Sequence, residues 1–84
     1  MKNSSYLQVF EDFQFSEQEK TVCLWLCNGL NYTEIGKRLG LSAHTVKNYM
    51  HKAKFRLYSE GHRVTTKLDF ISLIMQISKA FSES

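Results

Sequence analysis

The sequence predicts a small all-α protein, and three observations lead to this fold class. The 84 residues contain no proline and only four glycines, which disfavours a turn-rich β architecture. Hydrophobic residues make up 43% of the chain and aromatic residues 13%, enough for one compact core. Apolar residues also recur at spacings of three and four, as they do along the buried side of a helix. We therefore expect a single helical domain.

Residues 1–14 form a first segment for which two structures are open. After two serines, its apolar residues recur at helical spacing at Tyr6, Leu7, Phe10 and Phe13. This spacing favours a short amphipathic helix, and a partly ordered tail is the alternative. In either case the apolar side chains need a surface to cover, on this chain or on a partner. We place the main domain at residues 15–84.

The next helix has recognisable signals at both ends. Ser16 and Glu19 have the S-x-x-E spacing of a capping box, so the helix should begin near Glu17. Asn28 and Gly29 should end it, because glycine adopts the left-handed conformation that often follows a helix. We therefore expect one helix over about eleven residues.

Two shorter signals predict a helix-turn-helix. Asn31 is a second cap, for a helix over residues 32–39 that Gly40 closes. Ser42 then caps a longer helix over residues 43–57. Two helices joined by a three-residue turn containing glycine form the helix-turn-helix arrangement, although many helical hairpins share this spacing.

The helix over residues 43–57 has two chemically different faces. One narrow stripe comprises Val46, Met50, Ala53 and Leu57. The opposite side carries His44, Lys47, Asn48 and His51. From Lys37 to Arg56 the chain contains six basic residues and no acidic one. This segment cannot neutralise itself and favours an external anion such as DNA, the alternative being an ordinary solvated face.

The last helix is expected from about Lys67 to Ala80, after a turn at Gly61 and a cap at Thr65 or Thr66. Its apolar residues cover roughly 240° of the circumference, more than one contact needs. The surplus predicts a homodimer interface. The interface residues would be Phe70, Leu73, Ile74, Ile77 and Phe81. The alternative is that the segment at residues 1–14 folds over this helix, and both arrangements can hold at once.

A longer pattern covers about half of the chain and reads FSEQEKTVCLWLCNGLNYTEIGKRLGLSAHTVKNYMHKAKFRL. It resembles the LuxR-type (GerE-type) helix-turn-helix domain of bacterial transcription regulators. The matching residues are Glu19, Val22, Gly29, Leu30, Glu34, Ile35, Leu39, Ser42, Thr45, Val46, Lys47 and Leu57. The resemblance implies a four-helix domain whose third helix reads the DNA major groove and whose fourth forms a dimer.

The same resemblance implies which residues contact DNA. Base contacts would come from Lys47, Asn48 and His51. His44 lies near the helix start and could contact either a base or the backbone, and we count it with the base contacts. Backbone contacts would come from Thr33, Lys37, Thr45, Tyr49 and Lys52. The chemistry agrees, because Lys can donate to guanine and Asn can pair with adenine, while ammonium and hydroxyl groups bind phosphate.

The chain departs from the usual family pattern at five positions. These are Gln18, Gly36, Tyr49, Lys52 and Arg56. Gly36 should allow a neighbouring helix to approach closely, and none of the five removes a core residue. Gln18 and Tyr49 could alter how the domain holds phosphate.

These observations favour a stand-alone DNA-binding regulator that acts as a homodimer on inverted repeats. The alternative is a protein-interaction module that binds a larger regulator or RNA polymerase. No nucleophile turn or phosphate loop points to an enzyme, and Cys23 and Cys27 fit small buried side chains better than a zinc site. We expect no cofactor and no metal. Without an apolar span or signal peptide, a cytoplasmic location is expected. The initiator Met favours a full-length chain, and any missing part would precede it.

Overall fold

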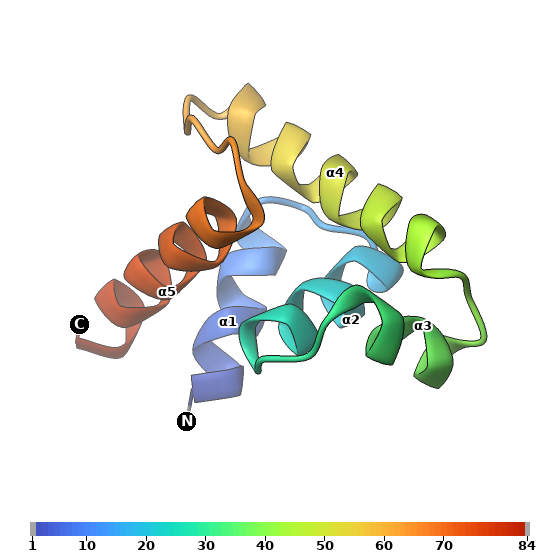
Figure 1. The fold of residues 1–84 in the computed structure, drawn as a ribbon. Coiled ribbons are helices and arrows are strands. Elements are labelled where there is room, and N and C mark those ends of the chain that lie inside the picture. The colour runs from blue at the N-terminus through green and yellow to red at the C-terminus, as the bar shows by residue number, and fades with distance from the viewer. Residues whose placement is uncertain (1, 84) are drawn as a thin grey trace.

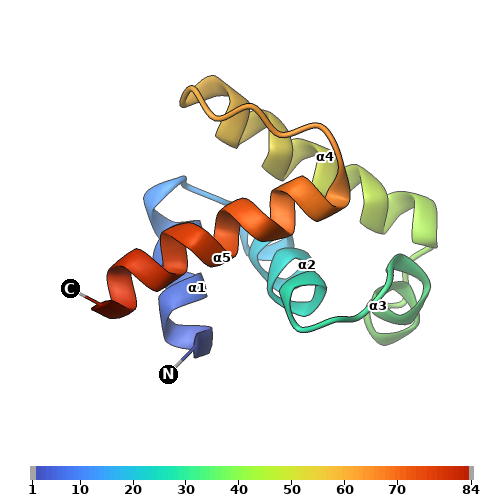
Figure 2. The same ribbon diagram turned by 60° about the vertical axis from the view of Figure 1, so that its left-hand side comes forward.

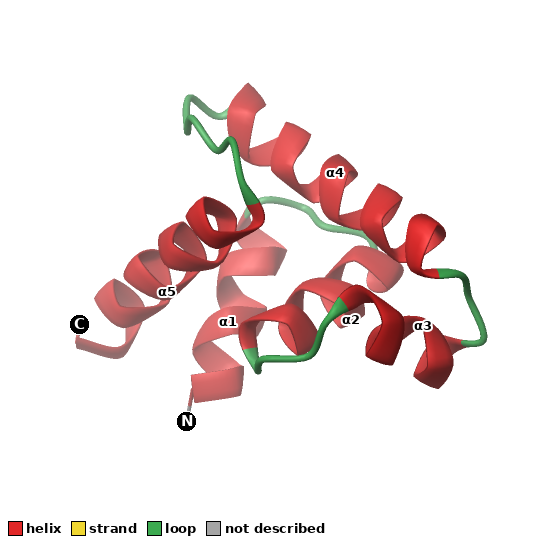
Figure 3. Cartoon of the chain, viewed as in Figure 1, coloured by secondary structure: helices red, strands yellow, loops and turns green. Residues whose placement is uncertain are grey.

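The computed structural model describes residues 2–83, with side chains described for residues 5–80. Within this range the chain is entirely helical, without strands (Figure 3), as the sequence predicts. The helices are α1 Lys2–Asp12, α2 Glu17–Cys27, α3 Tyr32–Leu39, α4 Ala43–Ser59 and α5 Lys67–Glu83. The N-terminal segment is therefore a helix, and the last helix continues beyond its predicted end at Ala80.

The helices form two packed groups that share α2. In one group α4 packs on α2 and α3, and in the other α1 packs on α5 and α2 (Figures 1 and 2). The first group encloses a cluster of Val22, Leu26, Ile35, Val46 and Met50. The second encloses a larger cluster of Tyr6, Val9, Phe10, Phe15, Cys23, Cys27, Ala53, Leu57, Phe70 and Ile74. Because Ala53 and Leu57 belong to the second cluster, α4 is anchored in both groups.

The predicted caps set the helix starts. The Ser16 hydroxyl accepts from the Glu19 N–H at 3.2 Å, and the Glu19 carboxylate accepts from the Ser16 N–H at 3.1 Å. This capping box begins α2 at Glu17, as predicted. Asn31 caps α3 as predicted, and Glu34 completes a second box that the sequence analysis did not identify, with distances of 2.8 and 2.9 Å.

The turn between α3 and α4 explains the glycine at position 36. The Leu41 N–H donates to the Gly36 carbonyl at 2.8 Å, which folds the turn back over α3. A Cβ atom at Gly36 would lie 2.5 Å from the Leu41 carbonyl oxygen. Gly36 is therefore needed for the close approach of the turn backbone, not of a neighbouring helix as expected. Gly40 ends α3 in the left-handed conformation, with φ of 71°.

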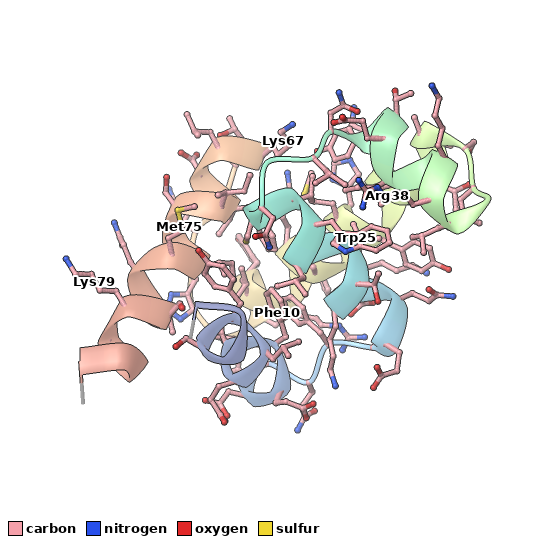
Figure 4. The ribbon with its side chains drawn as sticks, turned by 90° about the horizontal axis from the view of Figure 1, so that it is seen from below. Phe10, Trp25, Arg38, Lys67, Met75 and Lys79 are labelled. Carbon is pink, nitrogen blue, oxygen red and sulfur yellow. The ribbon has the colours of Figure 1, made fainter. Side chains whose placement is uncertain are left out.

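The packing of α1 involves residues of the predicted dimer interface. Phe70 and Ile74 are completely buried within the chain, in the cluster that also contains Phe10 of α1. Figure 4 shows Phe10 in the interior. Leu73 and Ile77 are half-buried against the same cluster. The side chain of Phe81 lies outside the described residues. Within this chain the N-terminal segment packs on the last helix, as the alternative expectation stated.

Candidate nucleic-acid interface

The candidate interface is the exposed side of α4, and its two faces are divided as the sequence predicts. Val46, Ala53 and Leu57 are completely buried, and Met50 is 2% exposed. The four candidate base-contacting side chains, His44, Lys47, Asn48 and His51, are all exposed. Core packing therefore fixes the rotation of α4 and turns this polar stripe outward.

The start of α4 is held by its cap. The Ser42 hydroxyl accepts from the Thr45 N–H at 3.1 Å, and the two hydroxyl groups lie 3.0 Å apart. The cap therefore fixes the half-buried Thr45 side chain as well as the first turn of the helix. On α3, Thr33 and Lys37 are exposed and four residues apart, so they share one side of that helix.

Two aromatic rings lie under basic side chains, one on α4 and one between α2 and α3. The Lys52 Nζ lies 5.4 Å from the centre of the Tyr49 ring, and the Arg38 guanidinium lies 5.7 Å from the centre of the Trp25 ring. Figure 4 shows Trp25 and Arg38 side by side. Tyr49 is half-buried against the cluster beneath α3 and α4, so its ring is both packing and a platform for Lys52. These contacts limit the freedom of the two cations.

Not every base of the acid-free segment is available to an external anion. Arg56 Nε donates to a Glu19 carboxylate oxygen at 2.6 Å, and its Nη2 lies 3.3 Å from the other oxygen. Lys54 Nζ donates to the Thr65 carbonyl at 3.0 Å. The expectation of an un-neutralised segment is therefore wrong for Arg56, because an acid from α2 reaches it. The expectation of an external anion remains for the basic residues of this segment whose side chains point outward.

The ion pair also sets the protonation of Glu19, which is only 2% exposed. Burial alone would raise the pKa of this carboxyl, but hydrogen bonds from Arg56 and Ser16 together outweigh burial and hold the pKa below its usual range. Glu19 therefore remains charged at neutral pH, and it joins the capping box of α2 to α4.

His51 lies in a cationic environment. Partial burial lowers the pKa of its imidazole, and Lys54, Lys47 and His44 lower it further by repulsion. A neutral imidazole carries one donor and one acceptor, so in the free protein it is suited to pair with a base edge.

Two exposed aromatic residues extend this face. From the sequence, Phe55 is expected on the free side, in contact with a sugar or a neighbouring helix, and Tyr58 has no assigned role. Phe55 is 71% exposed and Tyr58 is 63% exposed, both on the C-terminal half of α4. The helical spacing places them on the free side. Helical spacing alone does not show whether other parts of the chain cover the two rings.

The arrangement of α3, its tight turn and the outward polar face of α4 defines a helix-turn-helix DNA-binding domain. A family model described as bacterial regulatory proteins, luxR family, matches residues 14–68, which is more than half of the chain. The chain therefore belongs to the LuxR family, whose members are DNA-binding transcription regulators and, in general, not enzymes. The comparisons find no match among curated proteins or solved structures.

The family match leaves out two parts of the structure. It does not include α1, and it ends at residue 68, near the start of α5. These are the two helices that pack on each other. Across residues 2–83, none of the helices has the length and apolar character needed to cross a membrane.

Proposed function

We propose that the protein binds a specific duplex DNA sequence and regulates transcription from it, with α4 in the major groove. The observation that carries this proposal is the exposed stripe of His44, Lys47, Asn48 and His51 on a helix whose opposite side is completely buried. Lys47 would donate to the guanine O6 and N7 atoms, and Asn48 would pair with the adenine N6 and N7 atoms. His51 and His44 would contact neighbouring base edges.

Five further residues would hold the domain on the DNA backbone. They are Thr33, Lys37, Thr45, Tyr49 and Lys52. The first two come from α3 and the others flank the base-contacting stripe of α4. Hydroxyl and ammonium groups bind phosphate without reading sequence, so these residues would set the register of α4. A bacterial regulator with this ligand would work in the cytoplasm, where the chromosome lies.

We propose that a homodimer delivers two such helices to an inverted repeat. Because Phe70 and Ile74 are buried in the cluster that contains Phe10 of α1, we place the dimer contact on the opposite side of α5. Leu68 is 71% exposed and Met75 is 44% exposed, and their spacing of seven positions places both on one stripe. Two-fold symmetry would then set half-sites about one DNA turn apart.

Selection from a random duplex library at about 150 mM salt tests the proposal, since salt controls the phosphate contribution. The wild type should enrich an inverted repeat. Lys47→Ala or Asn48→Ala should cost roughly 1–3 kcal/mol and relax the preference at one base, whereas Lys52→Ala should weaken binding to all sequences equally. Lys20→Ala is a control of equal charge, because Lys20 pairs with acids on α1 and α2.

The outcomes of the selection separate the functional alternatives. Equal loss on every sequence for Lys47, Asn48 and Lys52 would refute the assignment of base readers. Binding without enrichment would indicate a backbone binder with little specificity. No DNA binding at all would favour a protein-interaction module that acts on a larger regulator or RNA polymerase.

A further inference from the structure

The exposed aromatic pair on α4 continues the stripe proposed to read bases. His44, His51 and Tyr58 are spaced seven residues apart, and so are Asn48 and Phe55. Seven residues are close to two turns of an α-helix, so all five side chains project from nearly the same side. The exposed face of α4 is therefore one strip, polar in its N-terminal half and aromatic in its C-terminal half.

The surroundings of Phe55 leave its ring open to a ligand on this side. Two surface hollows meet at Phe55 and His51. Lys52 lines one hollow. Lys54 lines the other, where its ammonium also donates to the uncharged Thr65 carbonyl, so a cation stands on each side of the ring. Of the acids beside the first hollow, Glu19 is neutralised by Arg56, and Glu60 lies at the C-terminal end of α4. An apolar ring framed by cations fits a ligand that is anionic and carries apolar groups.

The major groove of DNA combines phosphate charge with apolar groups on the bases. DNA is also the ligand already proposed for the neighbouring turns of α4. The thymine C5-methyl is the apolar group that a base pair presents in the major groove, and phenylalanine is among the side chains that contact it. Phe55 follows His51 by one helical turn, a rise of about 6 Å along the axis. Successive base pairs are about 3.4 Å apart, so this rise corresponds to about two base pairs.

We propose that Phe55 is a specificity-determining residue that reads a thymine methyl about two base pairs outward from the base contacted by His51. Tyr58 lies beyond it, where its hydroxyl donates to the DNA backbone. This inference rests on the proposed function and extends its footprint in each half-site. It predicts a thymine preference that the polar residues of α4 do not create.

The first experiment is the library selection repeated with Phe55→Ala and His51→Ala. Wild type should enrich thymine at one outer position of each half-site, and Phe55→Ala should lose only that preference. His51→Ala should lose a different preference, about two base pairs further in. The matched control is Leu7→Ala, which removes an exposed apolar side chain, 41% exposed, from α1. Leu7→Ala should keep the complete wild-type site.

The second experiment removes the methyl group itself. Deoxyuridine in place of the outer thymidine keeps the base pair and deletes only the methyl. It should weaken wild-type binding about 3- to 5-fold, the value of one buried carbon. Phe55→Ala should bind both duplexes equally. Phe55→Leu should restore part of the preference for thymine over uracil, because the leucine side chain is large enough to contact the methyl group.

Three results would count against the inference in different ways. If wild type enriches an inverted repeat but binds thymine and uracil equally, the assignment of Phe55 is wrong and the proposed function stands. The same holds if uracil weakens Phe55→Ala as much as wild type. If wild type enriches no sequence, both the proposed function and this inference fail. Phe55 is exposed, so the circular dichroism spectrum of Phe55→Ala should match that of wild type in both experiments.

Discussion

The ion pair between Arg56 and Glu19 links the start of α2 to the C-terminal half of α4, and its contribution to stability is measurable. Glu19 accepts from the N–H of Ser16, the N-cap of α2, and from two nitrogens of Arg56. Arg56→Met keeps an unbranched apolar side chain in place of the aliphatic part of Arg56 and removes the donors. Glu19→Gln keeps an oxygen for the Ser16 N–H and removes the charge. The two variants therefore remove the ion pair from either side.

The two single variants should differ in cost because the two partners differ in exposure. The Glu19 side chain is 3% exposed, whereas the Arg56 side chain is 39% exposed. Removing one partner of a fully buried pair costs about 3–5 kcal/mol. Water can reach Arg56, so we expect about 2–3 kcal/mol for Arg56→Met, which leaves a buried carboxylate. Glu19→Gln leaves a cation that water already reaches, so we expect about 1–2 kcal/mol.

Urea unfolding of wild type, both single variants and the double variant measures these values and the coupling between the residues. We expect the double variant to be more stable than the sum of the single losses by about 1 kcal/mol or more. Arg56→Met should also lower the melting temperature by roughly 10–20 °C, as expected for a domain of this size. A coupling below about 0.5 kcal/mol would refute the argument that this pair fastens α4 to α2.

Three further predictions concern acid, the core and the turn. Folding lowers the pKa of Glu19, so its contribution to stability is complete above the unfolded pKa near 4.5 and is lost as pH falls through the folded pKa. The free energy of unfolding should therefore fall less steeply with decreasing pH in Glu19→Gln than in wild type. Phe10→Ala should cost about 3–5 kcal/mol in urea unfolding, because Phe10 is completely buried and its ring stacks on Phe15 at 5.2 Å. Gly36→Val should cost at least about 1–3 kcal/mol by the same measurement, because its branched side chain would press on the Leu41 carbonyl.

A specific result would contradict each of these three predictions. An identical acid profile for wild type and Glu19→Gln would mean that other carboxyl groups govern acid unfolding. A loss for Phe10→Ala no larger than that for the exposed Leu7→Ala would mean that α1 does not pack on the core. Unchanged stability in Gly36→Val would mean that the turn can move away from α3 at no cost.

The features that could be predicted from sequence are those determined by residues close together in the chain. Ser16 and Ser42 set helix starts because a cap acts on backbone three residues away. The faces of α4 followed from apolar spacing, since a helix with one buried stripe has only one rotation that buries it. The helix-turn-helix and the exposed candidate base readers were therefore predictable.

The features that could not be predicted depend on contacts between distant residues. Arg56 and Glu19 are 37 positions apart, so the local charge pattern could not show that one base was already neutralised. The surplus apolar surface of α5 was equally consistent with a second chain and with α1. Periodicity shows that such a surface must be covered, and only the packing of Phe10 against Phe70 and Ile74 shows what covers it.

The positions of the two helix ends have a practical consequence. The first turn of α1 and the last turn of α5 lie at the same end of the molecule, whereas α3 and the beginning of α4 lie at the other (Figures 1 and 2). A fluorophore, affinity tag or fused domain joined at either terminus would stand clear of the residues of α3 and the beginning of α4 that are proposed to touch DNA. A chain tethered to a sensor surface through α5 would thus present its reading helix to duplexes in solution.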